Sequence, residues 1–247
     1  MEPAFVLKDL QLGYGGQEVL RVDELVIPQG QMVFVIGKSG TGKSTLLESL
    51  GLMSNTFIRT ATRKPELHIE GTCFDPLALW EGDQEQLSRI RRERFSFIFQ
   101  TTNLMPNFTI GENIRMAAFS AELDEGVMQG RIAELLEILD LPADILDKPA
   151  HAISGGQRQR IAFIRALVKQ FSVLLADEPT GNLDPANAVV LFQVLKDQLQ
   201  QRKATAVIVT HHLELAQRFG DVVLDLRHVH GKVNEPAQVH LFGVGAS

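Results

Sequence analysis

The residues with the clearest chemical signature run from Gly37 to Thr45, where Gly-Lys-Ser-Gly-Thr-Gly-Lys-Ser-Thr matches the phosphate-binding pattern G-x-x-x-x-G-K-[ST]. The glycines let the backbone fold tightly, so successive N–H groups can point inward, and the N-terminus of a following helix adds positive potential. Lys43 can then reach the β and γ phosphates of a nucleotide, and the Ser44 hydroxyl can ligate Mg²⁺. The predicted contacts come from Gly37, Ser39, Gly40, Thr41, Gly42, Lys43, Ser44 and Thr45.

A pair of carboxylates, Asp177 and Glu178, comes directly after the apolar run from Val173 to Ala176. If that run is a buried parallel strand, both side chains emerge at its carboxyl end, where open α/β sheets bind their ligands. Asp177 beside Mg²⁺ would support the ion, and Glu178 would be free to orient or deprotonate an attacking water molecule. The pair therefore adds hydrolysis to the prediction of nucleotide binding.

A second anion cradle is predicted at Ser154-Gly155-Gly156-Gln157. Ser154 is a good N-cap, the two glycines expose N–H groups, and the helix running to Val168 aims its positive end at the same point. One nucleotide does not need two cradles on the same chain.

Alternating strand and helix patterns must position these residues. Apolar runs predict strands at 5–12, 19–27, 32–36, 67–74, 95–99, 173–176 and 206–209, and a terminal hairpin at 222–226 and 229–233. Helical patterns occupy 44–52, 83–92, 110–120, 127–139, 154–168 and 185–200. The order predicts an α/β fold in one domain, 1–247: a parallel sheet wrapped by helices with an N-terminal antiparallel β subdomain (1–99 and 153–247), and an inserted helical subdomain (100–152).

The composition of the 247 residues, 45% hydrophobic and 22% charged, is that of a soluble globular protein. A net charge of −6 disfavours a broad nucleic-acid surface, and the basic run from Arg89 to Arg94 is interpreted as a solvated helix face. The single cysteine, Cys73, excludes internal disulfides and cysteine-rich zinc sites and fits a reducing compartment. No apolar run is long enough to cross a bilayer, so any membrane role must come through a partner.

Together, these motifs resemble the ATP-binding subunit of an ABC transporter, a P-loop NTPase, over nearly the whole chain. The loop at 37–45 resembles the Walker A motif of that family, 154–157 its signature motif, and Asp177-Glu178 the end of its Walker B motif. The resemblance also implies roles that the chemistry alone does not assign. Tyr14 is similar to the adenine-stacking aromatic, Gln100 to the Q-loop glutamine of the catalytic and metal site, Asn182-Leu183-Asp184 to the D-loop that contacts nucleotide through Asp184, and His211 to the switch histidine.

In that family the signature glycines cap the γ-phosphate held by the Walker A loop of a second subunit, so the resemblance implies a two-fold dimer with MgATP between the copies. ATP and Mg²⁺ are the expected cofactors, and the expected catalytic residues are Lys43, Gln100, Glu178 and His211. A transmembrane permease subunit is the expected partner, which would place the chain peripherally on the cytoplasmic face of the inner membrane.

The stretch from Phe99 to Ile114 resembles the Q-loop region of the lipoprotein-releasing, macrolide-exporter and cell-division ATPases, which favours an export or substrate-extraction type. An amino-acid-type importer and a permease-coupled regulator that transports nothing remain alternatives. Soluble repair and translation ATPases of the family are disfavoured, because their coiled coils, zinc modules or second cassette are missing. Leu104, Met105 and Phe108 either form a groove for a permease helix or fill the core of the helical subdomain.

Overall fold

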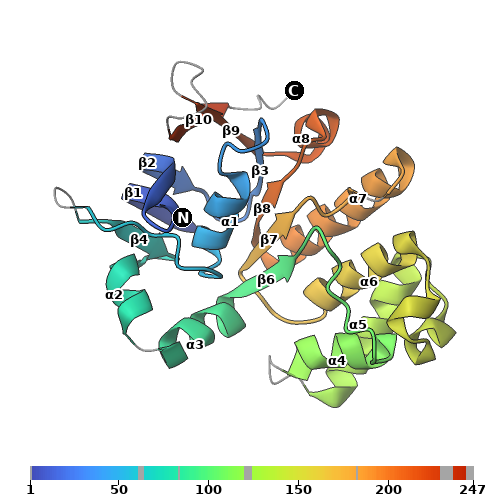
Figure 1. Cartoon of the computed structure of the whole chain (residues 1–247). Helices are drawn as coiled ribbons and strands as arrows, with labels where there is room; N and C mark the ends of the chain where they lie inside the picture. The colour runs from blue at the N-terminus through green and yellow to red at the C-terminus, as the bar shows by residue number, and fades with distance from the viewer. Residues whose placement is uncertain are drawn as a thin grey trace.

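The computed structural model describes residues 2–60, 64–82, 84–119, 124–181, 183–228 and 236–242. In these residues one ten-stranded sheet runs in the order β5-β4-β1-β2-β10-β9-β3-β8-β7-β6 (Figure 1). Its strands are β1 (Phe5–Tyr14), β2 (Gln17–Ile27), β3 (Met32–Gly37), β4 (Glu66–Ile69), β5 (Thr72–Phe74), β6 (Phe95–Ile98), β7 (Val173–Asp177), β8 (Thr205–Val209), β9 (Val222–His228) and β10 (Ala237–Phe242).

Helices cover both faces of this sheet (Figure 1). They are α1 (Lys43–Leu50), α2 (Pro76–Glu81), α3 (Gln84–Arg94), α4 (Ile110–Phe119), α5 (Glu125–Ile138), α6 (Gly155–Leu167), α7 (Pro185–Arg202) and α8 (Leu213–Phe219), with the short 3₁₀ helices η1 (Ala143–Asp147) and η2 (Ala150–Ala152). The α/β class predicted from the sequence is confirmed.

The sheet divides into a parallel half and an antiparallel half. Strands β6, β7, β8, β3 and β9 pair in parallel, so their carboxyl ends meet at one edge, and the residues after β3, β7 and β8 lie close together there. Strands β1, β2, β4 and β5 pair antiparallel, as the N-terminal β pattern predicts. The parallel half therefore positions the predicted nucleotide site.

Alternate residues of the central strands supply two separate cores, one on each face. Phe34 and Ile208 belong to the core that α4, α5, α6, α7 and α8 complete. Val35 and Val207 belong to the other, which includes residues of α1, α2 and α3 and of β1, β2 and β4. Because successive strand side chains point to opposite faces, α1 and α6 are held on opposite sides of the sheet.

Three local predictions need correction. The strand expected at 67–74 is a hairpin, β4 and β5, because Glu70 and Gly71 form a tight turn. The short helices α2 and α8 were missed, although Asp75 caps α2 by accepting hydrogen bonds from the N–H groups of Leu77 and Ala78. The antiparallel partner of β9 is β10 at 237–242, and the strand expected at 229–233 lies outside the described residues.

The basic run at 89–94 is only partly a solvated face. Arg91 donates to the carbonyl oxygen of Leu52 at 3.0 Å, and Arg94 donates to that of Ile69 at 3.2 Å. These two arginines therefore tie α3 to the loop after α1 and to the end of β4.

Candidate functional site

The phosphate loop links β3 to α1 in the geometry that its glycines permit. Gly37, Gly40 and Gly42 have φ values of 148°, 81° and 85°, a range that favours glycine, and Gly42 is the N-cap of α1. At Gly37 a Cβ atom would lie 2.6 Å from the carbonyl oxygen of Leu226, so β9 also forbids a larger residue there. The N–H groups of the loop are thus exposed at the N-terminus of a helix, a position that favours anion binding.

Lys43 is buried at the first position of α1, with 7% of its surface exposed. Its Nζ donates to the carbonyl oxygens of Gly37 and Lys38, both at 3.0 Å, so the ammonium is folded back over the loop. Burial lowers the pKa of Lys43, and the nearby carboxylates of Glu178 and Asp177 act in the opposite direction. The two carbonyl oxygens therefore hold the ammonium over the loop, and the two carboxylates favour its charged form.

Ser44 and Asp177 come together across the site. The Ser44 hydroxyl donates to Oδ2 of Asp177 at 2.9 Å, although 132 residues separate them in the chain. Two neighbouring ligands of an octahedral Mg²⁺ ion with bonds of about 2.1 Å lie about 3.0 Å apart, so this oxygen pair fits that cation.

Glu178 and His211 form the second link in the site. Oε1 of Glu178 lies 2.7 Å from Nε2 of His211, because the parallel pairing of β7 with β8 brings their carboxyl ends side by side. Only 13% of the Glu178 side chain is exposed, whereas 56% of His211 is. Glu178 has φ = 47°, an uncommon value for a residue with a side chain, and such strain is often found at functional positions.

Two predicted contacts lie at the margins of this cluster. Tyr14, at the end of β1, is 46% exposed, and its hydroxyl donates to Oε2 of Glu48 on α1 at 2.8 Å. Burial is the main cause that raises the pKa of Tyr14, with a further contribution from Glu48. Gln100 is exposed two residues after β6, at the same edge of the sheet as Asp177.

Ser154 caps α6, as the sequence predicts for the start of the second cradle. The hydroxyl of Ser154 accepts from the N–H of Gln157 at 3.2 Å, and the Gln157 side chain accepts from the N–H of Ser154 at 2.9 Å. This reciprocal pair fixes the start of α6. A Cβ at Gly155 would approach only Arg158 within 4 Å, and one at Gly156 only Leu183, so the glycine backbone is open on its outer side.

The two cradles are not joined within one chain. Among the described residues, the side chains of Ser154 and Gln157 accept from each other's N–H groups, and the Ser154 carbonyl accepts from the N–H of Arg158 at 2.9 Å. None of these hydrogen bonds reaches the loop at 37–45. Asp184 caps α7 by accepting from the N–H of Asn187 at 3.0 Å, a bond that lowers its pKa. Asn182, the first residue of the expected D-loop, lies outside the described residues.

Sequence reasoning missed the contribution of β9. A cavity of about 650 Å³ adjoins the phosphate loop, and Asp225 to His228 line it together with Gly37, Lys38 and His211. No sequence motif marks β9. Its contribution to the site can be found only from the strand order, which places β9 beside β3 in the sheet.

A phosphate loop after a central strand, a serine–aspartate oxygen pair whose spacing suits Mg²⁺ and a second carboxylate directly after the strand that ends at that aspartate define a P-loop nucleoside triphosphatase. A sequence model described as "ABC transporter" matches residues 20–181. The chain belongs to the ABC transporter family and is an ATPase cassette of that family.

Among its relatives, the lipoprotein-releasing system ATP-binding protein LolD 2 of Caulobacter vibrioides is 36% identical over 236 residues, which cover 93% of this chain and 96% of the relative. The macrolide export ATP-binding/permease protein MacB of Shigella flexneri is 36% identical over 96% of this chain, which spans 35% of that longer protein. The fold is similar to the dimeric post-hydrolysis structure of the ATP-binding cassette MJ0796 bound to ADP and Pi. That comparison has a TM-score of 0.78 and 27% identity, and it covers 98% of this chain and 100% of the other.

Proposed function

We propose that this chain binds and hydrolyses MgATP as a face-to-face dimer and thereby powers a membrane transporter of the export or substrate-extraction type. The observation that carries the proposal is the separation of the two cradles. One half-site is formed by Lys43, Ser44, Asp177, Glu178 and His211. The N–H groups at the start of α6 open outward and make no hydrogen bond to that half-site. A second copy supplies what each half-site lacks.

Within the composite site the residues divide the work of phosphoryl transfer to water. Glu178 holds the water and accepts its proton, and His211, whose Nε2 lies 2.7 Å from that carboxylate, orients it and contacts the γ-phosphate. Lys43 and the glycine N–H groups of both copies offset the charge that develops on the phosphoryl oxygens. Mg²⁺, held by Ser44, Asp177 and Gln100, supplies further charge neutralisation when bound. Tyr14 stacks on the adenine ring.

Mixing two inactive variants tests the composite site. Lys43→Ala removes the ammonium group of the phosphate loop, and Ser154→Arg blocks the second cradle at 154–157. Each variant alone should therefore lose ATP hydrolysis. Mixed dimers contain one site with an intact loop and an intact cradle, so about a quarter of the parental activity should return for random pairing. If the mixture stays as inactive as its components while both variants remain folded, hydrolysis does not need a shared site.

The Q-loop region offers a surface for the permease. Met105 and Phe108 are 43% and 40% exposed, whereas Leu104 packs against the core beside α4. Asn113 is 3% exposed and holds the loop, since its Oδ1 accepts from the N–H of Met105 at 2.7 Å and its Nδ2 donates to the carbonyl of Thr109 at 2.9 Å. Each of the two sequence alternatives therefore describes part of the loop. Leu104 packs against the core, whereas Met105 and Phe108 face outward.

We infer that a permease segment docks on Met105 and Phe108, and that residues 100–152 transmit its movement as one subdomain. Phe108→Asp should abolish co-purification with the permease and leave ATP binding intact. Val26→Asp, at a similarly exposed valine on β2, is the matched control. Unchanged co-purification of the Phe108 variant would contradict the docking surface.

The relatives that carry export and lipoprotein-releasing names support the export or extraction type over an importer or a pure regulator. None of the helices in the described part of the chain is long and apolar enough to cross a membrane. We propose a peripheral position on the cytoplasmic face of the inner membrane, where ATP is supplied. Transport by vesicles reconstituted with the permease, driven by ATP added on the cassette side only, tests both the direction and the face.

A further inference from the structure

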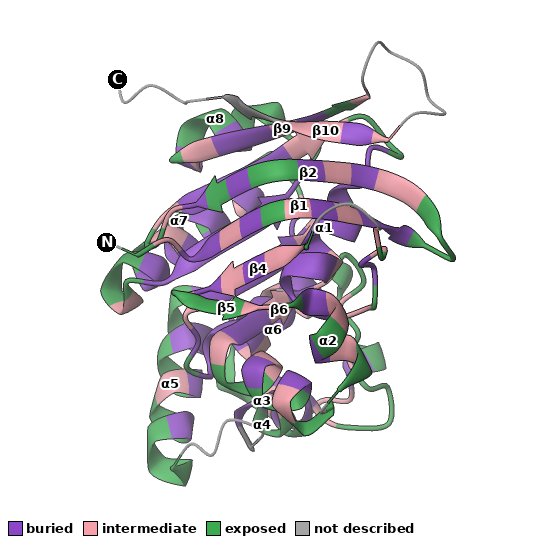
Figure 2. Cartoon of the chain, turned by 90° about the vertical axis from the view of Figure 1, so that its left-hand side faces the viewer, coloured by how far each residue is buried: buried purple, intermediate pink, exposed green. Residues whose placement is uncertain are grey.

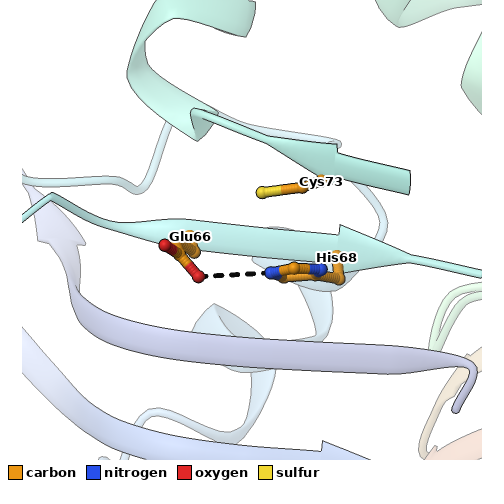
Figure 3. Close-up of side chains that lie close together, drawn as sticks. All are labelled: Glu66, His68 and Cys73. Carbon is orange, nitrogen blue, oxygen red and sulfur yellow. Dashed lines mark hydrogen bonds and ion pairs between the residues drawn. The ribbon is translucent and has the colours of Figure 1, made fainter. Parts of the chain in front are cut away.

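Three side chains with metal-binding atoms gather on the hairpin of β4 and β5, at the edge of the sheet that does not form the nucleotide site. Figure 3 shows Glu66 and His68 on β4 and Cys73 on β5. A carboxylate oxygen, a ring nitrogen and the sulfur all lie within 4.8 Å of one another. Neither the proposed hydrolysis nor the proposed docking surface uses these residues.

The turn of the hairpin fixes this arrangement. Glu70 and Gly71 both have positive φ, 48° and 78°, as a two-residue type I′ turn requires. This turn sets the register that places His68 directly opposite Cys73. Glu66 precedes His68 by two residues, so all three side chains point to the same face of the sheet.

Arg94 holds the turn in place from the neighbouring helix α3. Its guanidinium donates to the carbonyl of Ile69 at 3.2 Å and pairs with the carboxylate of Glu70 at 3.0 Å. On the other face of β4, Leu67 and Ile69 are buried in the core. The backbone that carries the three side chains is therefore anchored on both sides, which favours a preorganised site.

The donor set has the chemistry of a zinc site. Nε2 of His68 lies 3.2 Å from Oε2 of Glu66, and two ligands of a tetrahedral ion with bonds of about 2.0 Å are about 3.3 Å apart. A thiolate and a carboxylate together carry two negative charges, which match a divalent cation. The sulfur favours zinc over the hard Mg²⁺ ion expected beside Ser44 and Asp177.

We propose that Glu66, His68 and Cys73 form a Zn²⁺ site in which a water molecule is the fourth ligand. Cys73 is exposed, and the side chains of His68 and Glu66 are 27% and 45% exposed, so an ion and its water can enter from solvent. The three-residue strand β5 lies at the edge of the sheet beside β4 (Figure 2). A bound ion would join the two strands. Edge strands are the part of a sheet with the fewest partners, so this link restrains it.

Co²⁺ binding can be assigned to this site, because the chain has one cysteine and any thiolate-to-cobalt absorption must come from Cys73. CoCl₂ is titrated into the nucleotide-free, reduced protein without Mg²⁺. One equivalent should produce tetrahedral d–d absorption and a thiolate-to-cobalt charge-transfer band, and ZnCl₂ should remove both. ZnCl₂ should also protect Cys73 from maleimide and raise the unfolding temperature.

Three variants test the thiolate and imidazole ligands. Cys73→Ser should lose the charge-transfer band, and His68→Gln should raise the dissociation constant for Co²⁺ at least about tenfold. The matched control, Thr72→Cys with Cys73→Ser, keeps one exposed thiol on the same strand but on the opposite face, and should give no band. Circular dichroism verifies that each variant is folded.

The proposal is overturned if the parental chain shows no thiolate band, if His68→Gln binds Co²⁺ as tightly as the parent, or if the Thr72 control gives the same band. Any of these results would mean that the hairpin does not assemble a three-ligand site.

Discussion

Replacing Glu178 with glutamine tests the base of the reaction most directly. Glutamine keeps the side-chain volume and an oxygen for the 2.7 Å contact with His211, but its amide cannot take a proton from water at neutral pH. Loss of a general base slows turnover by about 10²–10⁴-fold, which corresponds to about 3–5 kcal/mol of transition-state stabilisation. We expect steady-state phosphate release to fall by that factor.

ATP binding should survive the same change. Asp177 still faces Lys43 and Ser44, and removing the negative charge of Glu178 from the neighbourhood of Lys43 leaves the ammonium freer to attract phosphate. The variant should therefore bind ATP at least as tightly as the parent and accumulate as an ATP-bound dimer. Light scattering with and without ATP measures the dimer, and single-turnover phosphate release measures the chemistry.

Glu93→Gln, at an exposed carboxylate on α3, is the matched control and should behave as the parent. A Glu178→Gln protein that hydrolyses ATP at the parental rate would refute the assignment of the base. Because Glu178 and His211 are in contact, His211→Ala combined with Glu178→Gln should be little slower than the slower single variant. Fully multiplicative losses would show that the two side chains act independently.

Three further predictions concern single residues. Tyr14→Ala should weaken ATP binding by about 5–150-fold in an equilibrium titration, since base stacking contributes about 1–3 kcal/mol, whereas Tyr14→Phe should stay near parental. Burial lowers the pKa of Lys169 from 10.5 to about 8, so the unfolded chain binds more protons between these values and stability should rise with pH there. In urea unfolding, Lys169→Met should abolish that rise and stabilise the fold at pH 7 by about 1–2 kcal/mol, after the loss of its hydrogen bond to the Arg92 carbonyl. Ser154→Ala should destabilise the start of α6 by about 1 kcal/mol and reduce ATP-dependent dimerisation while leaving nucleotide binding by the monomer unchanged.

The phosphate loop could be predicted from sequence because its function depends on local backbone geometry. Glycines at 37, 40 and 42 and the following lysine specify the turn within nine residues, and the distant residue Leu226 adds only a limit on the size of residue 37. The same holds for the capping pair of Ser154 and Gln157, three residues apart. Motifs of this kind carry their own structure, so a single sequence identifies them.

Features that depend on strand register could not be predicted in the same way. The metal-binding cluster requires that the chain turn at Glu70-Gly71, whereas the apolar pattern of 67–74 reads as one continuous strand. The cavity beside the loop requires β9 to lie next to β3, although nearly 190 residues separate them. Local patterns give the period of a strand but not its neighbour, so these two features emerged only from the fold.

The proposed need for a second molecule follows from the way that one sheet distributes its helices. Leu46 and Leu50 of α1 pack on one face of the sheet and Ile161 and Phe163 of α6 on the other, because alternate strand residues feed two separate cores. The helix ends that attract anions are thereby tied to opposite faces of the sheet, and swinging α6 toward its own phosphate loop would expose the core that it covers. Exposing a large apolar surface is unfavourable, so the proposed pairing completes the site with less loss of buried apolar surface than bending the chain would.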